Sequence, residues 1–471
     1  MSRVFALSLL ALTLFLSGCA GVGSLSGNNP DTAKPQVHRQ QRNHSLHQET
    51  QADLLNVNTN DLWQRVRAGF DIPDPDLPII INHASQLAEN PEYINRLMQR
   101  SSPYLYYIVE EVEARDMPTE LALLPFVESA FDPKALSPAK ASGIWQFMPA
   151  TGKNFNLTQN MFRDERRDII QSTRAALDYL QRLYKIFGDW PLALAAYNWG
   201  EGSVTRAIKK NQAAGLPTDY YSLTLPNETR NYVPKLLAYK RLIDHPKSYG
   251  FVLPKLENHP YFVAAPIYKD IDVDLAIQLS EISREEFLSL NPSFTKPVIL
   301  SAASTKILLP YGNATIFQDN LNAFKKPLSS WTAVWVEKTD TVDKLASTLK
   351  VDPVQLRELN SIPRGMKIKA GSTVLIPKSP LNDGNVSLHL ADNAALDLER
   401  EVAPTPLNCR SYGKRRSCAS ASPILINNRM PVRDFRKLQK VEKKSPPAPK
   451  NEGKSRGKKV QGNVKTIISQ R

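Results

Sequence analysis

The sequence predicts a mainly helical protein that continues into small α+β modules and ends in a basic tail. Apolar residues recur at helical spacing over much of residues 61–245. A strand–helix–helix–strand pattern then appears twice between residues 260 and 378, and Lys and Arg accumulate after residue 400. Helical and strand periodicities of this kind are the main sequence signal for secondary structure. With 471 residues, the chain is long enough for two or more domains.

The first 18 residues have the features of a signal peptide. Met1–Arg3 is a short basic start, and the apolar run Val4–Leu16 is too short to cross a membrane comfortably. The tetrapeptide Leu16–Cys19 resembles a bacterial lipobox, in which the cysteine thiol receives a lipid. We therefore expect cleavage after residue 18 and lipidation of Cys19. The alternative is a plain secretory signal with an incidental cysteine.

The residues after this cysteine bear on localisation. Residue 20 is Ala rather than Asp, which among bacterial lipoproteins implies an outer-membrane lipoprotein that faces the periplasm. Buried lipid chains would anchor the protein firmly, because each CH₂ group contributes about 0.8 kcal/mol. Residues 19–60 are rich in small and polar side chains, and we expect a flexible tether there.

The helical part divides into a lead-in over residues 61–102 and a larger block over residues 103–245. In the lead-in, Trp63, Val66 and Phe70 recur at helical spacing. The helices expected in the larger block cover residues 103–115, 118–132, 164–187, 192–197 and 228–243, and Pro133 stops the second of them. The second of these helices places Leu121, Leu124 and Glu128 on one face, so that Glu128 extends from a buried surface.

Glu128 is the candidate catalytic group of this block. Apolar residues crowd it in sequence, with Leu123–Val127 before it and Phe131 after it. A carboxyl group among apolar neighbours loses hydration of its charged form, so its pKa rises. A raised pKa makes a carboxyl group usable as a general acid near neutral pH. The alternative is that Glu128 only ends a helix, with its carboxyl group in water.

Three motifs begin at this acid and follow it in order. The first runs from Glu128-Ser129 through Phe131, Pro133, Ala135 and Ser137 to Gly143-Ile144-Trp145-Gln146-Phe147-Met148-Pro149. The others are Ala196-Tyr197-Asn198-Trp199-Gly200 and Glu228-Thr229-Arg230-Asn231-Tyr232-Val233. Together they resemble the signature of the lysozyme-like lytic transglycosylases, which cleave peptidoglycan. The resemblance implies a lysozyme-like helical catalytic domain over residues 103–245.

The resemblance also implies a role for each motif position. Glu128 would be the catalytic acid, and the substrate-binding residues would be Ser137, Gln146, Met148, Tyr197, Asn198, Glu228 and Tyr232. Tyr197 and Asn198 would lie over the sugar and its acetamido group, and Glu228 would hydrogen-bond within this floor with support from Tyr232. A place in the ordinary core is the alternative for Met148 and Tyr232. The charged run Asp164–Asp168 is expected to be a salt-bridged scaffold.

A lone acid favours a non-hydrolytic reaction. Glycosidases usually need two carboxylates at the scissile bond, and no second carboxylate lies near Glu128 in a comparable motif. Glu128 would protonate the oxygen between MurNAc and GlcNAc, and its carboxylate would then accept the proton of the C6 hydroxyl that attacks C1. The product would be 1,6-anhydro-MurNAc. The attacking group belongs to the substrate itself, which gives a proximity advantage, and water must be excluded.

Two segments after the helical block repeat one pattern. Residues 330–378 resemble a LysM module, which binds glycan that contains GlcNAc; Asp340-Thr341 suits the start of its first helix. Residues 260–312 repeat the pattern without the Asp-Thr pair and without the Trp335 strand. We interpret this first copy as a degenerate LysM-like module whose glycan binding stays open.

The basic tail is predicted to be disordered over residues 379–471. Residues 401–471 carry 18 Lys and Arg against 4 Asp and Glu, which accounts for the whole net charge of +14. The tail either contacts anionic lipid heads or wall polymers, or is a solvated extension. Cys409 and Cys418 could form a disulfide in an oxidising compartment or remain free thiols.

These observations limit the function. The catalytic block has almost no net charge, so nucleic acid is not an expected partner; peptidoglycan strands and, through the lipid anchor, a membrane are. No cofactor and no metal site are expected. The prediction is a lipid-anchored peptidoglycan lytic transglycosylase of the bacterial cell envelope. The alternatives are a non-catalytic wall-binding lipoprotein and a hydrolytic muramidase.

Overall fold

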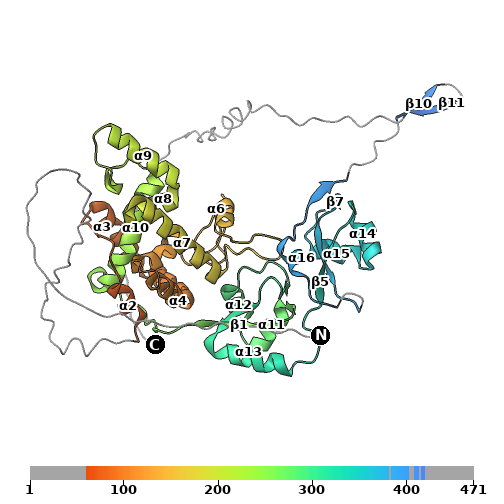
Figure 1. Cartoon of the computed structure of the whole chain (residues 1–471), viewed down its shortest axis with the longest axis horizontal. Helices are drawn as coiled ribbons and strands as arrows, with labels where there is room; N and C mark the ends of the chain where they lie inside the picture. Colours follow the sequence, from red (N-terminus) through yellow and green to blue (C-terminus); the bar gives the residue numbers. More distant parts are fainter. Residues whose placement is uncertain (1–59, 381–382, 402–407, 413–414, 420–471) are drawn as a thin grey trace, which may run out of the picture. The chain divides into compact units, whose positions relative to one another are not determined.

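A computed structural model describes residues 60–380, 383–401, 408–412 and 415–419 (Figure 1). It confirms the predicted fold class, because long helices dominate up to residue 249 and short strands with short helices follow. The chain forms two compact units. The first contains the residues up to Val336 together with Gly371–Leu396, and the second contains Glu337–Ala370 and the residues from Asp397 on.

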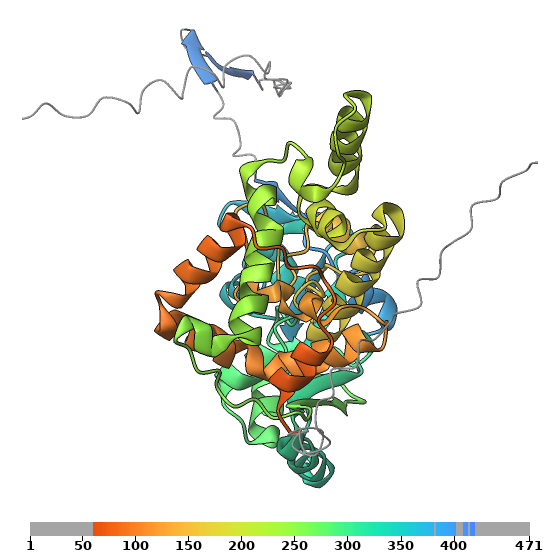
Figure 2. The same cartoon turned by 90° about the vertical axis from the view of Figure 1, so that its left-hand side faces the viewer.

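The helices of the first unit enclose one hydrophobic core. At its centre lies α8, whose residues 191–196 are all buried. Helices α7, α9 and α10 pack against α8, and α3 packs along α10 (Figures 1 and 2). The helices of this region are α2 Leu62–Ala68, α3 Pro78–Ala88, α4 Pro91–Glu113, η1 Thr119–Leu123, α5 Leu124–Glu128, α6 Pro149–Asn154, α7 Ile169–Phe187, α8 Trp190–Trp199, α9 Glu201–Ala213, η2 Tyr220–Ser222, α10 Asn227–Asp244 and η3 Pro246–Tyr249.

The predicted boundary at residue 103 is wrong, because Pro103 lies inside α4. A proline in a helix leaves the carbonyl four residues earlier without its N–H donor. Here that carbonyl belongs to Gln99, and the hydroxyl of Ser102 donates to it at 2.8 Å. The hydroxyl of Ser101 likewise donates to the Met98 carbonyl at 2.7 Å. These side chains satisfy the backbone locally, so lead-in and catalytic block share one continuous helix.

The helix predicted from Pro118 up to Pro133 is interrupted, and it ends at Glu128 rather than just before Pro133. Residues 119–123 form the 3-10 helix η1, and the α-helix α5 begins at Leu124. A continuous α-helix would bring the ring of Pro125 against the carbonyl of Leu121. Restarting the helix at Leu124 puts Pro125 in its first turn, where proline is tolerated.

The helix predicted over residues 164–187 begins only at Ile169. Asp168 is its N-cap, and its side chain accepts a hydrogen bond from the Gln171 N–H. The preceding residues form the expected salt-bridged scaffold, since Arg166 pairs with Asp164 at 2.7 Å. Charged residues that cap and brace a loop therefore resemble a first helical turn in sequence.

The segment after residue 260 has the predicted module pattern. The antiparallel pairs β1–β4 and β2–β3 surround two short helices, and a buried core contains Ile271, Phe287 and Leu309. The elements are β1 Phe262–Pro266, β2 Ile271–Asp272, α11 Val273–Ser280, α12 Arg284–Leu290, β3 Val298–Ile299, β4 Lys306–Pro310 and α13 Tyr311–Ala323. The helix α13, which packs on β1 and β4, lies beyond the predicted end at residue 312.

The segment over residues 330–378 repeats the order strand, helix, helix, strand. In the first unit, β5 (Trp331–Trp335) pairs with β8 (Thr373–Pro377). The second unit contains β6 (Asp340–Thr341), α14 (Val342–Leu349), α15 (Pro353–Leu359) and β7 (Met366–Ile368). The Thr341 side chain accepts from the Lys344 N–H and so caps α14, which confirms the helix start that the Asp-Thr pair predicts.

The predicted disorder from residue 379 is wrong for residues 383–401. This stretch contains α16 (Leu388–Asp392) and the strand β9 (Leu398–Arg400), which pairs with β7. Val386 and Ala391 are buried, and the Val386 N–H donates to the carboxylate of Asp270 at 2.7 Å. The Asp270 partner of Val386 lies 116 residues away in sequence, so local periodicity could not reveal this contact.

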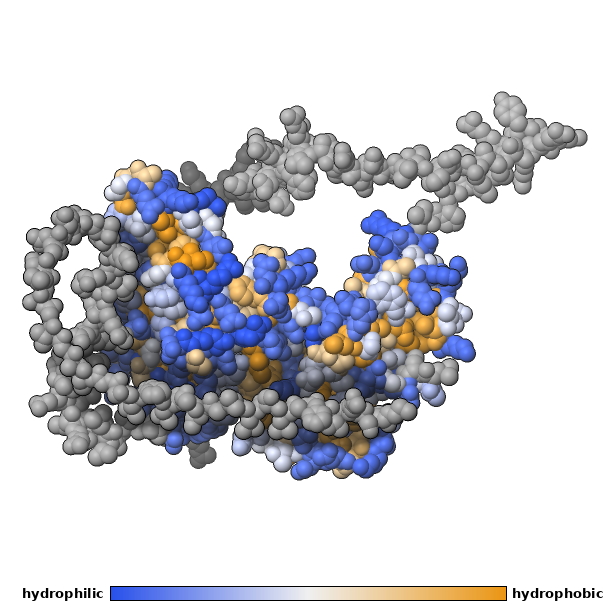
Figure 3. Space-filling view, in the orientation of Figure 1, coloured by the Kyte–Doolittle hydropathy of each residue, from blue (hydrophilic) through white to orange (hydrophobic). Residues whose placement is uncertain are grey.

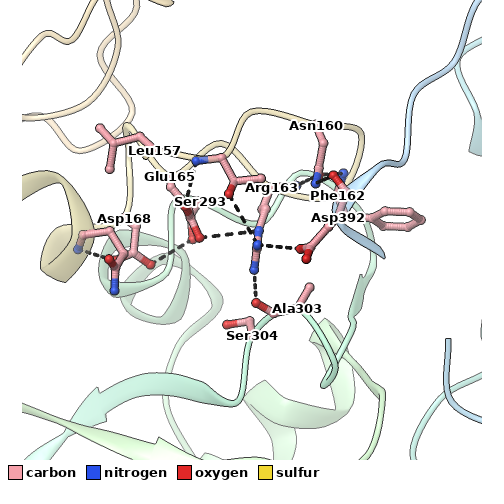
Figure 4. A network of polar contacts seen from close by, with 12 residues as sticks. Leu157, Asn160, Phe162, Arg163, Glu165, Asp168, Ser293, Ala303, Ser304 and Asp392 are labelled. Atoms are coloured by element: carbon pink, nitrogen blue, oxygen red, sulfur yellow. Dashed lines mark hydrogen bonds and ion pairs between the residues drawn. The ribbon is translucent and has the colours of Figure 1, made fainter. Parts of the chain in front are cut away.

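Arg163 connects three parts of the first unit (Figure 4). Its guanidinium donates to the carbonyl of Ala303 in the LysM-like segment and pairs with Asp392 of α16 at 2.9 Å. The neighbouring amide of Asn160 donates to the carbonyls of Ala391 and Asp392 at 3.0 and 3.1 Å. The loop before α7 therefore holds both distant segments through buried or half-buried polar contacts.

We predict that Arg163→Met loosens this junction by about 1–3 kcal/mol, because the loss leaves partly buried partners unpaired. Amide hydrogen exchange over residues 388–396 should become faster. The control is Arg284→Met, which removes a solvent-exposed pair with Asp274 and should leave exchange in this stretch unchanged. Identical exchange in the two variants would contradict the prediction.

Several predictions fall on other parts of the chain. The signal peptide, Cys19 and almost the whole tether lie outside the described residues. In the hairpin of β10 (Asn408–Tyr412) and β11 (Arg415–Ala419), Cys409 is opposite Cys418 in register, and the disulfide stays a prediction.

No helix of the described residues is long and apolar enough to cross a bilayer. The face in Figure 3 mixes hydrophilic and hydrophobic residues.

Candidate active site

One cavity of about 490 Å³ brings together every predicted catalytic and substrate-binding residue. It lies among the end of α5, the loop that leads to α6, the end of α8 and the first turns of α10. Its lining consists of Glu128, Ser137, Gln146, Met148, Tyr197, Asn198, Glu228 and Tyr232, together with Val127, Ala139, Ala141 and Lys235. A volume of this size suits a few sugar units or a comparable ligand.

Glu128 is the last residue of α5, and the helix is fixed at this end. The buried residues 119–126 anchor η1 and α5 in the core. The next residue, Ser129, donates its hydroxyl to the Ile144 carbonyl at 3.0 Å, which ties the end of α5 to the loop on the other side of the cavity. The position of the carboxyl group is therefore determined by packing on one side and by a hydrogen bond on the other.

The environment of Glu128 favours its protonated form. The pKa of this carboxyl group is raised from 4.5 to about 7, chiefly by burial and to a smaller extent by the nearby negative charge of Glu228. The Tyr232 hydroxyl donates a hydrogen bond to Oε1 of Glu128, which acts in the opposite direction and lowers the pKa. Desolvation is the largest effect, so a substantial fraction of Glu128 keeps its proton near pH 7.

Tyr232 and Tyr197 enclose the acid with hydroxyl groups that stay protonated. Burial raises the pKa of both phenols well above 10, and the charge of Glu128 raises it further. Tyr232 is 4% exposed on α10, and the hydroxyl of Tyr197 on α8 donates to the Trp145 carbonyl at 2.9 Å. Both phenols thus act as fixed donors rather than as bases.

The loop between α5 and α6 carries three of the predicted residues. Ser137 closes a tight turn, in which its hydroxyl accepts from the Ala141 N–H at 3.0 Å. Gln146 has a φ of 49° and donates its side-chain amide to the Gly143 carbonyl at 2.9 Å. Met148 is 42% exposed, so its thioether contributes an accessible apolar surface to the cavity rather than to the core.

Gly143 allows this loop to approach the scaffold before α7. Its φ is 81°, and a Cβ atom there would lie 2.1 Å from the carbonyl oxygen of Arg166. The Arg166 guanidinium in turn donates to the carbonyls of Lys140 and Phe147, at 2.6 and 3.1 Å. The glycine in the first motif is thus required by backbone conformation and by close contact.

The polar end of the cavity is built from α8 and α10. The amide of Asn198 donates to Glu228 at 3.3 Å, and its oxygen accepts from the Thr229 hydroxyl at 2.7 Å. These two bonds determine the orientation of the Asn198 amide. Glu228 is exposed in the first turn of α10, where a negative side chain is favoured by the helix dipole.

Sequence reasoning missed Lys235, and it missed the direct bond between Tyr232 and Glu128. Glu228, Tyr232 and Lys235 are spaced by four and then three residues, so they share one face of α10. This spacing could have placed Lys235 in the cavity. The bond from Tyr232 to Glu128 joins residues 104 apart in sequence, and no local pattern indicates it.

Comparisons with known proteins agree with this geometry. The family described as Transglycosylase SLT domain matches residues 106–217. Over 347 residues, the chain is 35% identical to the membrane-bound lytic murein transglycosylase D of Escherichia coli strain K12, which covers 71% of this chain and 75% of that protein. This chain belongs to the lytic murein transglycosylase family. The resemblance to the lytic transglycosylases and the predicted enzyme class are therefore confirmed.

Further matches of this lytic murein transglycosylase are shorter. The soluble lytic murein transglycosylase of Salmonella typhimurium is 35% identical over 124 residues, which are 25% of this chain and 19% of that protein. The crystal structure of the 70 kDa soluble lytic transglycosylase from Escherichia coli covers 28% of this chain and 22% of that chain, at 29% identity and a TM-score of 0.24.

A second family match concerns the module after the catalytic block. The family described as Lytic transglycosylase MltD, LysM-like domain matches residues 262–326. This range includes α13 and extends beyond the predicted end at residue 312. The first copy of the repeated pattern is therefore a LysM-like domain in its own right.

Proposed function

We propose that this lytic transglycosylase cleaves the β-1,4 bond between MurNAc and GlcNAc in peptidoglycan without water and leaves 1,6-anhydro-MurNAc. The observation that carries the proposal is Glu128, an acid with a pKa of about 7 in a cavity lined by amides, hydroxyls and aromatic side chains. Such groups match the hydroxyl, acetamido and ring surfaces of a sugar. A carboxylic acid that is protonated near neutral pH can serve as a general acid.

In the proposed reaction Glu128 acts twice. It first gives its proton to the glycosidic oxygen, which leaves with the GlcNAc residue as the bond from that oxygen to C1 of MurNAc breaks. The carboxylate then accepts the proton of the MurNAc C6 hydroxyl while the C6 oxygen bonds to C1. The proton balance closes, so Glu128 is ready for another cycle and no water is consumed. The hydrogen bond from Tyr232 stabilises the intermediate carboxylate.

The hydrolytic alternative would require Glu228 to act together with Glu128. Glu228 is the second carboxylate in the cavity, and a hydrolytic glycosidase needs such a partner for its acid. Against this role, Glu228 accepts a hydrogen bond from Asn198 and is exposed at the polar end of the cavity. In the proposed site, Glu228 instead orients the side-chain amide of Asn198, which would face the acetamido group of the sugar.

Product analysis tests the proposed function. Purified peptidoglycan is incubated with the protein, and the soluble fragments are analysed by mass spectrometry. We expect anhydro-muramyl ends, which are lighter by one water than the hydrolytic product. Reducing ends would identify a hydrolytic muramidase, and an absence of fragments would identify a non-catalytic wall-binding protein; either result would overturn the proposal.

The pH dependence of the wild type and of Tyr232→Phe tests the proposed acid. The rate should fall as the pH rises through about 7, because Glu128 then loses the proton that it must donate. Removal of the Tyr232 hydroxyl removes a bond that lowers the pKa of Glu128. The alkaline limb of kcat/KM in Tyr232→Phe should therefore move upward, by about one pH unit.

A matched control is Tyr221→Phe, which removes the hydroxyl of an exposed tyrosine that does not line the cavity. Its pH profile should coincide with that of the wild type. A downward shift of the alkaline limb in Tyr232→Phe would contradict the assignment of Glu128 as the proton donor.

The localisation that fits this function is the bacterial cell envelope. The Escherichia coli relative is named a membrane-bound murein transglycosylase. The lipobox-like Cys19 supports an outer-membrane lipid anchor that faces the periplasm, and the LysM-like domain supports contact with wall glycan. The basic residues after residue 400 would add contacts with anionic lipid or wall polymers. Metabolic labelling with a palmitate analogue, compared between wild type and Cys19→Ala, tests the anchor.

A further inference from the structure

A second pocket of about 410 Å³ adjoins the candidate active site. The two share Val127 and Lys235 in their linings, so they are contiguous along the boundary between α5 and α10. The remaining walls come from α3, from the start of α4, and from the buried rings of Phe126 and Tyr239. The Transglycosylase SLT domain match covers residues 106–217, so most of these walls lie outside it.

Lys235 is the charged group at this boundary. It is exposed on α10, on the face that carries Glu228 and Tyr232. Among the described residues it has no hydrogen-bond or ion-pair partner, whereas Arg241 on the same helix pairs with Asp74 at 2.8 Å. An unpaired cation at the mouth of a pocket is available to a negatively charged ligand.

The other lining groups add amide recognition and apolar surface. His83, Gln86 and Asn90 present ring nitrogens and amides, while Leu87 and Tyr93 present apolar and aromatic surface. His83 is held in place by a contact of 2.8 Å between Nε2 and the Asn231 side-chain oxygen. A cation, amides and small apolar surfaces together match a short peptide that carries carboxylates. They match an uncharged run of sugars less well, because sugar hydroxyls carry no negative charge that could pair with the Lys235 ammonium group.

The substrate of the proposed function carries such a peptide on one of its two sugars. The lactyl ether of MurNAc bears a short acidic peptide, whereas GlcNAc bears none. We propose that the pocket between α3, α4 and α10 receives this peptide, and that Lys235 pairs with one of its carboxylates. This inference rests on the proposed function, and it names a peptide-specificity site beside the groove for the glycan.

The test compares two substrates that differ only in the peptide. One is purified peptidoglycan, and the other is the same glycan after an amidase has removed its peptides. Lys235→Glu should lower the ratio of kcat/KM for peptide-bearing glycan to kcat/KM for bare glycan by about tenfold, because a charge-assisted contact becomes repulsive. The matched control Lys209→Glu, an exposed lysine on α9, should leave the ratio unchanged.

Gln86→Trp provides an independent test. Gln86 is exposed on α3 and lines this pocket but not the active-site cavity, so a large side chain there fills the pocket and leaves Lys235 in place. It should lower the same ratio. Thermal unfolding of each variant verifies that the fold is retained. Equal losses on both substrates would assign the pocket to the glycan, and unchanged rates on both substrates would show that the pocket does not bind the peptide; either result overturns the inference.

A binding measurement distinguishes a failure of the proposed peptide site from a failure of the proposed reaction. In Glu128→Gln, which lacks the catalytic proton donor, the affinity for a labelled disaccharide with its peptide is compared with the affinity for the bare disaccharide. We expect tighter binding of the peptide-bearing ligand by about tenfold, and loss of that difference when Lys235→Glu is added. Equal affinities would overturn the inference even if anhydro products form. A peptide preference without anhydro products would instead overturn the proposed function alone.

Discussion

Glu128→Gln should lower the release of anhydro-muropeptides by about a thousandfold, within the range that general acid catalysis contributes. Glutamine keeps the size and the polarity of the side chain, and the Tyr232 hydroxyl can still donate to its oxygen. The amide cannot give a proton to the glycosidic oxygen, and it cannot accept one from the C6 hydroxyl. Both halves of the proposed reaction therefore fail. The rate of product release is measured with purified peptidoglycan.

The control for this variant is Glu92→Gln, which makes the same change at a side chain that is 88% exposed on α4. Its activity should equal that of the wild type.

Loss of activity in Glu128→Gln should not result from unfolding. The pKa of Glu128 is raised in the folded state, so its contribution to stability is complete below pH 4.5 and is lost as the pH rises through about 7. Above pH 7, Glu128→Gln should therefore be at least as stable as the wild type. Full activity in Glu128→Gln would remove Glu128 from the mechanism.

Glu120→Ala should destabilise the protein by about 3–5 kcal/mol, because it leaves the buried charge of Lys240 without its partner. Glu120 is fully buried, and its carboxylate pairs with the Lys240 ammonium at 2.7 Å. The same carboxylate accepts from the N–H groups of Asp71 and Ile72 at 2.9–3.0 Å. One side chain thus holds the lead-in loop, η1 and α10 together, and α10 carries Tyr232. Urea unfolding with a constant m-value measures the loss.

Two further variants separate the charge from the packing. Asp274→Ala breaks an exposed ion pair with Arg284 and should change the stability by less than about 1 kcal/mol. The double variant Glu120→Ala/Lys240→Met should recover part of the loss, because it removes the unpaired charge. A cost of less than about 1 kcal/mol for Glu120→Ala would show that the buried pair does not stabilise the fold.

The sequence predicted the helices well where periodicity is long and poorly where polar side chains replace backbone bonds. The last helix of the catalytic block was expected at 228–243 and is observed at Asn227–Asp244. Pro103 suggested a boundary, but the Ser102 hydroxyl satisfies the carbonyl that the proline leaves open. The charged residues before Ile169 suggested a helical turn, yet they form caps and salt bridges. These hydrogen bonds join residues only two or three positions apart, but apolar periodicity and helix-breaker rules do not register them, because both ignore polar side chains that bond to the nearby backbone.

The site could be predicted as a set of residues but not as an electrostatic arrangement. Motif resemblance supplied the residues that the cavity brings together. The apolar sequence around Glu128 also pointed to the raised pKa, since burial is its largest cause. The opposing effect of Tyr232 and the contribution of Glu228 come from α10, about 100 residues later. Lys235 was missed because the motif ends at Val233, although helical spacing continues beyond it.

The pKa of Glu128 decides whether this carboxyl group can donate a proton at neutral pH. A pH titration of protein labelled with ¹³C at the glutamate carboxyl groups, followed by NMR, resolves this group; its signal is assigned by its absence in Glu128→Gln. We expect a midpoint of about 7 for Glu128. A midpoint near the ordinary value of 4.5 would mean that the carboxyl group is ionised at neutral pH, and it would contradict the proposed role as proton donor.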